Sequence, residues 1–545
     1  MAPSYPNRKA SATEGEPLLG GSNASTGRSG GSCLIFVLSF AAQLVTGLYF
    51  FWLLVHHWNL PQAPPDPLPT YNVAIIGAGP AGISAAQHLR NSHVTRNVHL
   101  NITIYESKPI LGGALALHGA DGSSVYPKDD PMQSPITAED VAGTALVWNN
   151  ALFTRDSENV LQDKIDFTEL GPEQIGYYKN TVKTVTASRP YSKTPMLTWV
   201  QLIWAYGSSV WRGDKLAQDG VLRRAMLKAP LAPNLEKIFH SLGILGPLQQ
   251  RSSDMLKGRS ISGRYAKEIL EPQVQRAYGQ SLNQVSGLAV MTAAAQEETA
   301  NAYQGGYLIQ RLRRIVDEID VEVRTSTRVT GIKYVEVGEN RLAWLIRHES
   351  ADGDGGNSSI EVFDKVIVAA LDFDIELENG DLSVLDLKNH YDIGAAEATM
   401  RNGNLFVPVH ITLFTSDAKL SPWDQDEEVL FLEPQKAAGM RELKLVREIF
   451  SHHDYSTKTE YLYRVLSVRP VLGELKRRAT ITWSYETRIE KAYPVLFPLQ
   501  RFPPFELPWA KGFWWTSIIQ RAGTSVDLNW LAGKVAAQDL IKQIT

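Results

Sequence analysis

The sequence has a single cysteine, Cys33, in 545 residues, which excludes an internal disulfide and any metal site built from cysteines. It also lacks an excess of charge of either sign, because 54 Lys and Arg are balanced by 58 Asp and Glu, so nothing indicates a nucleic-acid-binding surface. The 12 histidines show no metal-ligand spacing, and no Ser-His-Asp or paired-carboxylate arrangement can be assigned. What remains is an ordinary globular composition, 44% apolar and 21% charged, in a chain long enough for more than one domain.

One stretch near the N-terminus lacks charge altogether. Residues 33–55 carry no Asp, Glu, Lys or Arg, and a helix of that length rises about 34 Å, against about 30 Å of bilayer hydrocarbon. The stretch is longer than the apolar region of a signal peptide and has no small-residue cleavage site. We therefore expect a transmembrane anchor at 33–55, after a disordered tail at 1–32 and before a proline-rich linker at 56–70.

The charges before this stretch predict its orientation. Arg8, Lys9 and Arg28 precede it, so the positive-inside rule places the N-terminus in the cytosol and the body in a lumen, as a type II membrane protein. Residues 14–19 resemble an acidic dileucine sorting signal, which favours a vacuolar, lysosome-like or other endomembrane compartment. Asn357 begins a glycosylation sequon in a polar loop of the body, where we expect a glycan.

The body begins with a dinucleotide-binding fingerprint. A buried apolar strand is expected at 73–76 and a helix at 80–91, and between them three glycines stand at the Gly-x-Gly-x-x-Gly spacing. The first glycine allows the tight turn, the second lets the backbone approach a pyrophosphate, and the third permits close packing of helix on strand. The helix N-terminus would face that pyrophosphate with unpaired N–H groups. We expect the cofactor to contact Gly77, Gly79, Pro80, Ala81 and Gly82.

An acidic residue and a glycine pair follow this unit. Glu106 comes after an expected strand at 99–105, near the spacing at which a carboxylate accepts hydrogen bonds from ribose hydroxyls. Gly112 and Gly113 stand where flavoproteins of the amine-oxidase type carry a Gly-Gly doublet, which favours FAD over NAD. Those flavoproteins usually continue with an arginine, whereas Ala114 stands here. A flexible loop is the alternative interpretation of the doublet.

The rest of the chain alternates between two kinds of segment. Helical periodicity runs over 199–312, and strands are expected at 321–337, 341–347 and 360–370. More strand-like runs occupy 400–485, and a further strand is expected at 514–519. We therefore expect an α/β fold, with an FAD-binding Rossmann-like domain of the amine-oxidase type and an inserted α+β substrate domain. The expected segments are FAD-binding parts at 71–150, 313–375 and 511–545, a helical substrate-domain part at 151–312 and a substrate-domain sheet at 376–510.

Three further residues are expected at the cofactor. In flavoproteins of this class a valine backbone on the returning strand contacts the adenine ring, and Val329 is our candidate. Gly523 and Val526 lie at the turn before a helix expected at 526–544, whose N-terminus would stabilise negative charge on the reduced flavin ring. A plain amphipathic helix is the alternative for this last element.

Several stretches together resemble the prenylcysteine oxidases, FAD-dependent thioether oxidases also called prenylcysteine lyases. In family order across 71–545 these stretches are 75–90, 201–207 (QLIWAYG), 235–243, 271–281 (EPQVQRAYGQS), 303–308 (YQGGYL), 363–370 and 522–537. The Tyr-Gly-Gln-Ser at 278–281 is the most specific to the family. Three positions depart from the family pattern: Gln520 replaces an acidic residue, Ala114 replaces an arginine, and Arg276 is displaced by one position from a similar arginine.

The resemblance implies a reaction and a substrate region. It implies FAD-dependent oxidation of S-farnesyl- or S-geranylgeranyl-cysteine by O2 to a prenal aldehyde, cysteine and hydrogen peroxide, during the degradation of prenylated proteins. Because the flavin carries the hard step, no separate catalytic residue is assigned. We expect Trp204, Tyr206 and Tyr278 to line an apolar tunnel, with core packing as the alternative, and Gly305 and Gly306 to approach the flavin ring.

Two other functions stay open. A flavin amine or polyamine oxidase would share the fold and the fingerprint, but it would prefer acidic residues around a cationic amine. A membrane-anchored FAD-fold scaffold without catalysis is the second. The expected partners are prenylcysteine, O2 and, through residues 33–55, a membrane, with no metal and no nucleic acid.

Overall fold

The computed structural model divides the chain into two compact units, Met1–Pro67 and Leu68–Thr545. The structure describes residues 41–53, 68–92, 97–116, 144–146, 151–165, 168–169, 173–179, 182–189, 194–218, 235–298, 301–337, 341–350, 358–370, 376–377, 406–420, 429–432, 437–453, 456–500, 504–507 and 510–545.

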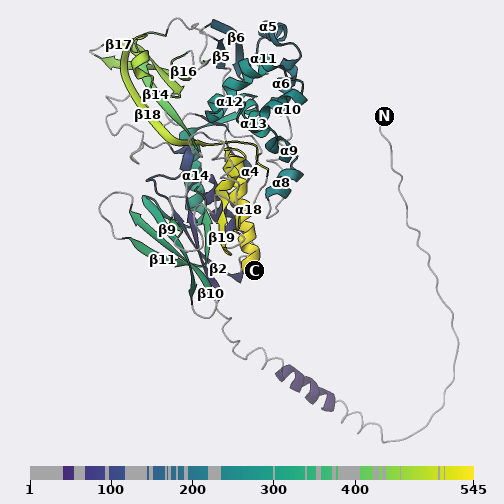
Figure 1. Ribbon diagram of the computed structural model, residues 1–545. Coiled ribbons are helices and arrows are strands. Elements are labelled where there is room, and N and C mark those ends of the chain that lie inside the picture. Colours follow the sequence, from purple (N-terminus) through teal and green to yellow (C-terminus); the bar gives the residue numbers. More distant parts are fainter. Residues whose placement is uncertain are drawn as a thin grey trace, which may run out of the picture. The chain divides into compact units, whose positions relative to one another are not determined.

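In the first unit, residues 41–53 form a helix with exposed side chains, drawn in purple in Figure 1. Within the described ranges, no helix is long and apolar enough to cross a membrane. Cys33 and the other residues of the expected anchor outside 41–53 are not among the described residues, and neither is Asn357. The anchor and the glycan therefore stay predictions.

A five-stranded parallel sheet forms the centre of the nucleotide-binding part. Its order is β19-β12-β1-β2-β8, with bounds Phe513–Trp515 for β19, Lys365–Val368 for β12, Thr70–Ile76 for β1, His99–Tyr105 for β2 and Glu322–Arg324 for β8. β1 is central because its last four residues, Val-Ala-Ile-Ile, are apolar on both faces and buried. The sheet joins strands from the three separate segments 71–150, 313–375 and 511–545.

Four helices belong to this part of the fold: α2 Pro80–Arg90, α4 Leu152–Leu161, α14 Gly305–Ile319 and α18 Val526–Ile544. α18 packs against α2 and α4, and Figure 1 shows α4 and α18 side by side. The contact between α2 and α18 is close because Gly533 faces the backbone of α2. A Cβ at Gly533 would lie 2.0 Å from the carbonyl oxygen of Ala81, so any side chain there would push the two helices apart.

A second sheet carries the chain from β8 back to β12. Its order is β11-β10-β9-β13, with bounds Ser359–Phe363, Arg341–Ser350, Thr327–Val337 and Glu376–Leu377. β10 runs antiparallel to both β9 and β11. β11 ends at Phe363 and β12 begins at Lys365, so the single strand that the sequence predicts at 360–370 is two strands in different sheets.

The third sheet has seven strands in the order β18-β14-β17-β16-β15-β5-β6. Its bounds are β5 Glu173–Lys179, β6 Val182–Arg189, β14 Phe406–Ser416, β15 Val429–Phe431, β16 Met440–His453, β17 Ser456–Ser467 and β18 Ile481–Pro494. Figure 1 shows β14, β16, β17 and β18 in green to yellow and β5 and β6 in blue. β5 and β6 lie within 151–312, the expected helical substrate-domain part, but before residue 199, where the helical periodicity of the sequence begins. This part therefore contributes two strands to the sheet besides its helices.

A helical layer accompanies this sheet. Its members are α5 Met196–Tyr206, α6 Ser209–Ala217, α8 Leu235–Ser241, α9 Leu245–Gln249, α10 Ser252–Gly258, α11 Gly263–Tyr265, η4 Ala266–Leu270, α12 Glu271–Tyr278 and α13 Gly287–Glu298. α13 is apolar on every side and packs against α6, α9, α10 and α12, as expected of a helix enclosed by others. A small sheet of β3 Thr144–Leu146, β7 Asn301–Gln304 and β4 Thr168–Glu169 places β7 between α13 and α14.

The C-terminal segment differs in part from its prediction. The sequence predicts a strand at 514–519, but only β19 pairs with β12, and the chain then forms a 3-10 helix, η5 Thr516–Arg521. The Thr516 hydroxyl donates to the Val368 carbonyl at 3.1 Å, which fixes the point where strand pairing stops. The final helix spans the residues that its apolar pattern predicts.

Candidate functional site

The loop between β1 and α2 has the geometry that the fingerprint predicts. Gly77 has φ +103°, a conformation that favours glycine, and its N–H donates to the Tyr105 carbonyl at 2.8 Å. A Cβ at Gly82 would lie 1.9 Å from the Gly77 carbonyl oxygen, so the turn requires glycine at both positions. α2 begins at Pro80, and no side chain in the described part of the protein caps its N-terminus. Its first free N–H groups are therefore available to an anion.

Glu106 holds this loop in place. One carboxylate oxygen accepts from the Ala78 N–H at 2.9 Å and the other from the Lys108 N–H at 3.0 Å. Its own backbone is fixed as well, since its N–H donates to Arg324 and its carbonyl accepts from Thr327. The sequence predicts the acid but not these backbone contacts, because they depend on where the two loops meet. Through these hydrogen bonds Glu106 connects the fingerprint loop to the end of β2.

The glycine doublet meets the fingerprint loop. The Gly112 N–H donates to the Ala78 carbonyl at 3.0 Å, and Gly112 and Gly113 have φ of +124° and +57°. A Cβ at Gly113 would lie 3.0 Å from the Cα of Gly79, and one at Gly79 would lie 3.6 Å from the Cα of Gly113. Two stretches of bare backbone therefore lie together beside a helix N-terminus. This cradle fits a pyrophosphate, which side chains here would exclude.

Lys108 is a residue of this region that the sequence reasoning missed. Its ammonium donates to the carbonyls of Gly113 and Ala116, each at 3.0 Å. Burial lowers the pKa of the Lys108 ammonium below its usual value, and the Glu106 carboxylate opposes that shift. Ala114 offers no charge, so the cation beside the doublet comes from the chain six positions earlier. The position of Lys108 between Glu106 and the glycine doublet could have indicated this role from the sequence.

The start of β9 lies next to Glu106. The Thr327 N–H donates to the Glu106 carbonyl at 2.8 Å, and Val329 follows two residues later with 7% of its surface exposed. The structure therefore brings Val329 to the same edge of the parallel sheet as the fingerprint. Its contact with an adenine ring stays a prediction.

The N-terminus of α18 is capped from its own chain. The Ser525 hydroxyl accepts from the Leu528 N–H at 3.2 Å, and Val526 is the first helical residue. Gly523 packs on the same side chain, because a Cβ there would lie 2.8 Å from a methyl carbon of Leu528. Gln520, which replaces the acidic residue of the family pattern, lies at the end of η5 and is partly exposed.

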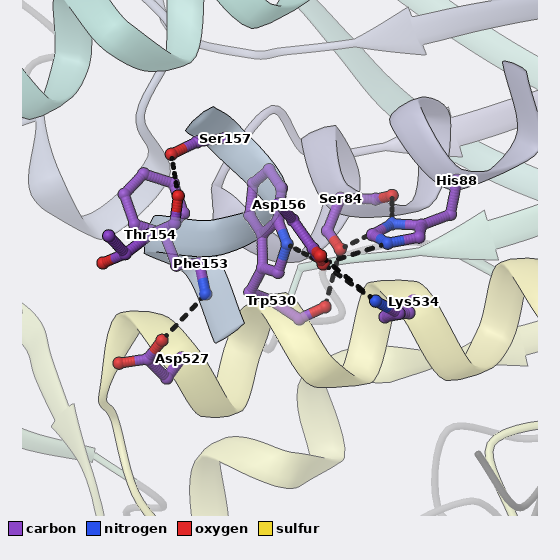
Figure 2. Close-up of polar contacts among 9 residues, drawn as sticks. All are labelled: Ser84, His88, Phe153, Thr154, Asp156, Ser157, Asp527, Trp530 and Lys534. Atoms are coloured by element: carbon purple, nitrogen blue, oxygen red, sulfur yellow. Dashed lines mark hydrogen bonds and ion pairs between the residues drawn. The ribbon is translucent and has the colours of Figure 1, made fainter. Parts of the chain in front are cut away.

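Asp527 joins the N-termini of two helices. Its carboxylate accepts from the N–H of Phe153, in the first turn of α4, at 3.0 Å, and only 2% of the residue is exposed. Figure 2 shows this contact between α4 and α18. Burial raises the pKa of the Asp527 carboxyl to about 7, and the charge of Asp156 adds to the rise, whereas the Phe153 N–H opposes it. The buried Asp527 carboxyl therefore keeps its proton up to about neutral pH.

Asp156 ties together all three helices α2, α4 and α18. It pairs with Lys534 at 3.0 Å and with His88 at 3.2 Å, and it accepts from the indole N–H of Trp530 at 3.1 Å. Burial alone would raise the pKa of Asp156, but His88 and Lys534 outweigh it and lower that pKa to about 2. The Ser84 hydroxyl donates to the Trp530 carbonyl at 2.6 Å in the same cluster (Figure 2). These contacts hold α2, α4 and α18 together.

The expected role of Trp204 in an apolar tunnel is wrong. Trp204 is 91% exposed, so its side chain faces solvent rather than a channel inside the protein. Tyr206 is buried, packs edge-on against Tyr265, and donates its hydroxyl to Glu268 at 3.1 Å. It is therefore a core residue of the helical layer, the alternative left open for it. The sequence misleads here because α5 is apolar on every side, a pattern typical of a buried helix.

Tyr278 ends α12 in a region of buried charge. It is 1% exposed, and burial raises the pKa of its hydroxyl, against the opposing interaction with Thr292. Gly279 follows with φ +65°, and a Cβ there would lie 2.7 Å from Nη1 of Arg441. Nε and Nη1 of Arg441 are also buried, and among the described residues nothing accepts a hydrogen bond from them. Burial lowers the pKa of the Arg441 guanidinium, against the effects of Tyr493 and Glu271.

Arg276 belongs to an ion network behind this position. It contacts the fully buried Glu442 at 2.7 Å and Glu297 at 3.3 Å, and Arg464 also pairs with Glu442 at 3.1 Å. The network links α12 and the end of α13 to β16 and β17. Arg276 therefore has a structural role in this network, and that role explains an arginine at this position independently of the family pattern.

Gly305 and Gly306 open α14 directly after β7. This puts a helix N-terminus at the junction between the helical layer and the nucleotide-binding part, since α14 packs against α2. Within the described residues, no group of three or more His, Cys, Asp or Glu could hold a metal ion.

Comparison with known proteins decides the family. The prenylcysteine lyase family profile matches residues 191–545, and a profile of NAD(P)-binding Rossmann-like domains matches residues 75–132. The chain belongs to the prenylcysteine lyase family. This confirms the resemblance drawn from 278–281 and the other stretches.

The relatives are distant. Human prenylcysteine oxidase 1 is 24% identical over 53% of this chain and 56% of the human protein, so the chain spans about half the length of that relative. The bovine prenylcysteine oxidase 1 is 21% identical over 89% of this chain and 91% of its own.

A redesigned putrescine oxidase shares the fold, with a TM-score of 0.51 and 14% identity over 88% of this chain and 100% of that structure. The nucleotide-binding part is thus of the Rossmann-like type found in that oxidase.

Proposed function

We propose that this protein is an FAD-dependent oxidase that converts S-prenylcysteine, O2 and water into a prenal aldehyde, cysteine and hydrogen peroxide. The observation that carries the proposal is the backbone cradle of Gly79 and Gly113 in a chain that belongs to the prenylcysteine lyase family. Bound FAD would take a hydride from the carbon next to sulfur and pass its electrons to O2. At 21–24% identity, the relatives support the class of reaction but do not indicate the length of the prenyl chain.

The residues present fit this cofactor. The fingerprint glycines, the first turn of α2 and the doublet would hold the pyrophosphate, with Lys108 contributing positive charge beside it. Glu106 would keep the loop closed and offer its remaining lone pairs to ribose hydroxyls. Val329 would contact the adenine end. The N-terminus of α18, capped by Ser525, would place a positive dipole end toward the flavin ring.

The charge beside Tyr278 favours an amino-acid thioether over a polyamine. Arg441 has two buried nitrogens without a hydrogen-bond partner among the described residues, next to Gly279 of the family-specific stretch. Glu271 acts on this guanidinium only through its charge, so the two nitrogens are left without hydrogen bonds within the described part of the chain, and a carboxylate is the group that a guanidinium binds best. We therefore assign Arg441 to the α-carboxylate of the cysteine. A polyamine, which carries only positive charge, would be repelled at the same place.

The test is flavin reduction without oxygen. Farnesylcysteine added anaerobically to the flavin-loaded protein should bleach the flavin absorbance, and readmitted O2 should restore it with release of hydrogen peroxide. Spermine, at the same concentration, should leave the flavin oxidised. Reduction by spermine together with no response to farnesyl- or geranylgeranyl-cysteine would assign the protein to the amine oxidases instead. Inertness toward both, with full flavin loading, would favour a scaffold.

A further inference from the structure

Helices α5 and α6 expose an apolar surface that the proposed function does not use. Five large apolar side chains lie on it with high exposed fractions: Met196 83%, Leu197 80%, Val200 53%, Trp204 91% and Trp211 54%. We name these five residues the α5–α6 apolar face. Large apolar patches on a protein surface are usually sites of interaction with a partner or a membrane.

The face follows from the periodicity of α5. Leu197, Val200 and Trp204 are spaced three and four residues apart, so they lie along one side of the helix. The other side packs inward through Leu202 and Tyr206. α5 has no charged residue, whereas the water-facing side of a helix in a soluble protein is normally polar. The helix is thus apolar on the side that the described residues leave exposed.

Positively charged side chains lie beside this face. Lys215 lies four residues after Trp211 on α6, and Arg212 is exposed beside that tryptophan. In the described residues 194–218, the exposed charged side chains are these two cations. Arg264, 62% exposed, donates to the Ala205 carbonyl at the end of α5 at 3.3 Å and pairs with Glu268 at 3.2 Å.

We propose that the α5–α6 apolar face docks the protein on an anionic lipid surface. Tryptophan is enriched at the boundary between lipid and water, and helices that lie in this boundary combine an apolar side with flanking Lys and Arg. The surrounding cations would meet anionic headgroups while Trp204 and Leu197 enter the acyl region. A second copy of the chain fits less well, because a two-fold contact through this face would set its positive rim against itself.

The docking does not rest on the proposed function, but it would serve it. An S-prenyl thioether carries a long isoprenoid chain and dissolves in lipid, so an enzyme for it gains from lying on the phase that holds its substrate. Docking would thereby explain why Trp204 is exposed rather than part of the expected tunnel.

The test uses the full chain with one spin label. Cys33→Ser removes the only native cysteine, and Gln201→Cys then places a label on α5 without removing any residue of the face. Glu318→Cys, exposed on α14, is the matched control. In vesicles of phosphatidylcholine with phosphatidylserine, the label at 201 should gain accessibility to oxygen and lose accessibility to a water-soluble nickel chelate. The label at 318 should stay accessible to the chelate.

Variants of the rim and the face complete the design. Trp204→Glu should abolish the immersion of the 201 label, and Lys215→Gln with Arg264→Gln should weaken binding to the vesicles about 25-fold, at roughly one factor of five for each charge. Flavin content and circular dichroism check that each variant is folded. A 201 label that stays in water in the presence of these vesicles would overturn the proposal. So would concentration-dependent broadening of its signal without vesicles, which would assign the face to a second copy.

Discussion

Replacement of Asp527 by asparagine should make the protein more stable at alkaline pH than the wild type. The pKa of Asp527 is about 7 in the folded protein, against about 3.9 for an aspartate in an unfolded chain. Between these two values the folded state keeps a proton that the unfolded state has lost, so stability falls as the pH rises from about 4 to about 7. Asparagine is neutral throughout and can still accept from the Phe153 N–H through its carbonyl.

The size of the effect follows from the shift. A difference of about three units costs the wild type about 4 kcal/mol of unfolding free energy above pH 7, and Asp527→Asn removes that cost. Because the residue is only 2% exposed, solvent screens little of it. For a unit as large as Leu68–Thr545, unfolding entropy amounts to about 1 kcal/mol per degree, so the variant should melt about 4 °C above the wild type at pH 8. Near pH 4 the two should coincide.

Thermal unfolding of flavin-loaded wild type and variant across this pH range is the assay. Asp156→Asn is the control with the opposite sign, because the pKa of Asp156 is lowered to about 2 by His88 and Lys534. Its ion pairs stabilise the fold above about pH 4 and are lost as the pH falls toward 2, so this variant should be less stable than the wild type at neutral pH. A difference between Asp527→Asn and wild type that does not change with pH would refute the reasoning.

Two substitutions test the other parts of the site. Gly82→Ala places a Cβ 1.9 Å from the Gly77 carbonyl oxygen, so this variant should lose most of its bound flavin, measured as flavin absorbance per protein. The control Gly258→Ala has open space around its Cβ and should retain the flavin. Full flavin content in Gly82→Ala would contradict the cradle. Arg441→Gln should raise KM for farnesylcysteine about 10-fold to 100-fold, which is the value of a hydrogen bond to a charged group. KM for farnesylcysteine methyl ester, which has no carboxylate, should change little. Equal effects on farnesylcysteine and its methyl ester would argue against the carboxylate contact.

The sequence predicts the parts of the site that are local in the chain. The apolar run before Gly77, the following helix and the acid after β2 lie within about 35 residues, near the span of one strand-helix-strand unit, and their order alone places Glu106 near the fingerprint. α18 is equally well predicted, because its apolar pattern and Ser525 cap are read from adjacent residues.

What the sequence could not predict depends on contacts between distant segments. Lys108 reads as a surface cation until the doublet folds back over it. Asp527 and Phe153 are separated by 374 positions, so nothing in either stretch signals their hydrogen bond. Trp204 shows the reverse error, because an apolar stretch indicates a preference for a dry environment without telling whether the protein itself or another surface provides it.

The packing of α18 on α2 has a consequence for how the protein is made. The fingerprint is complete once residue 106 has been synthesised, but its first helix lacks its partner until α18, which begins at Val526, has been made. At ordinary rates of translation this interval lasts from about twenty seconds to over a minute. During that time the face of α2 that Gly533 will cover remains open to chaperones or to wrong partners. A chain that stops shortly before Val526 would lack this contact, and the fingerprint helix would stay uncovered on that face.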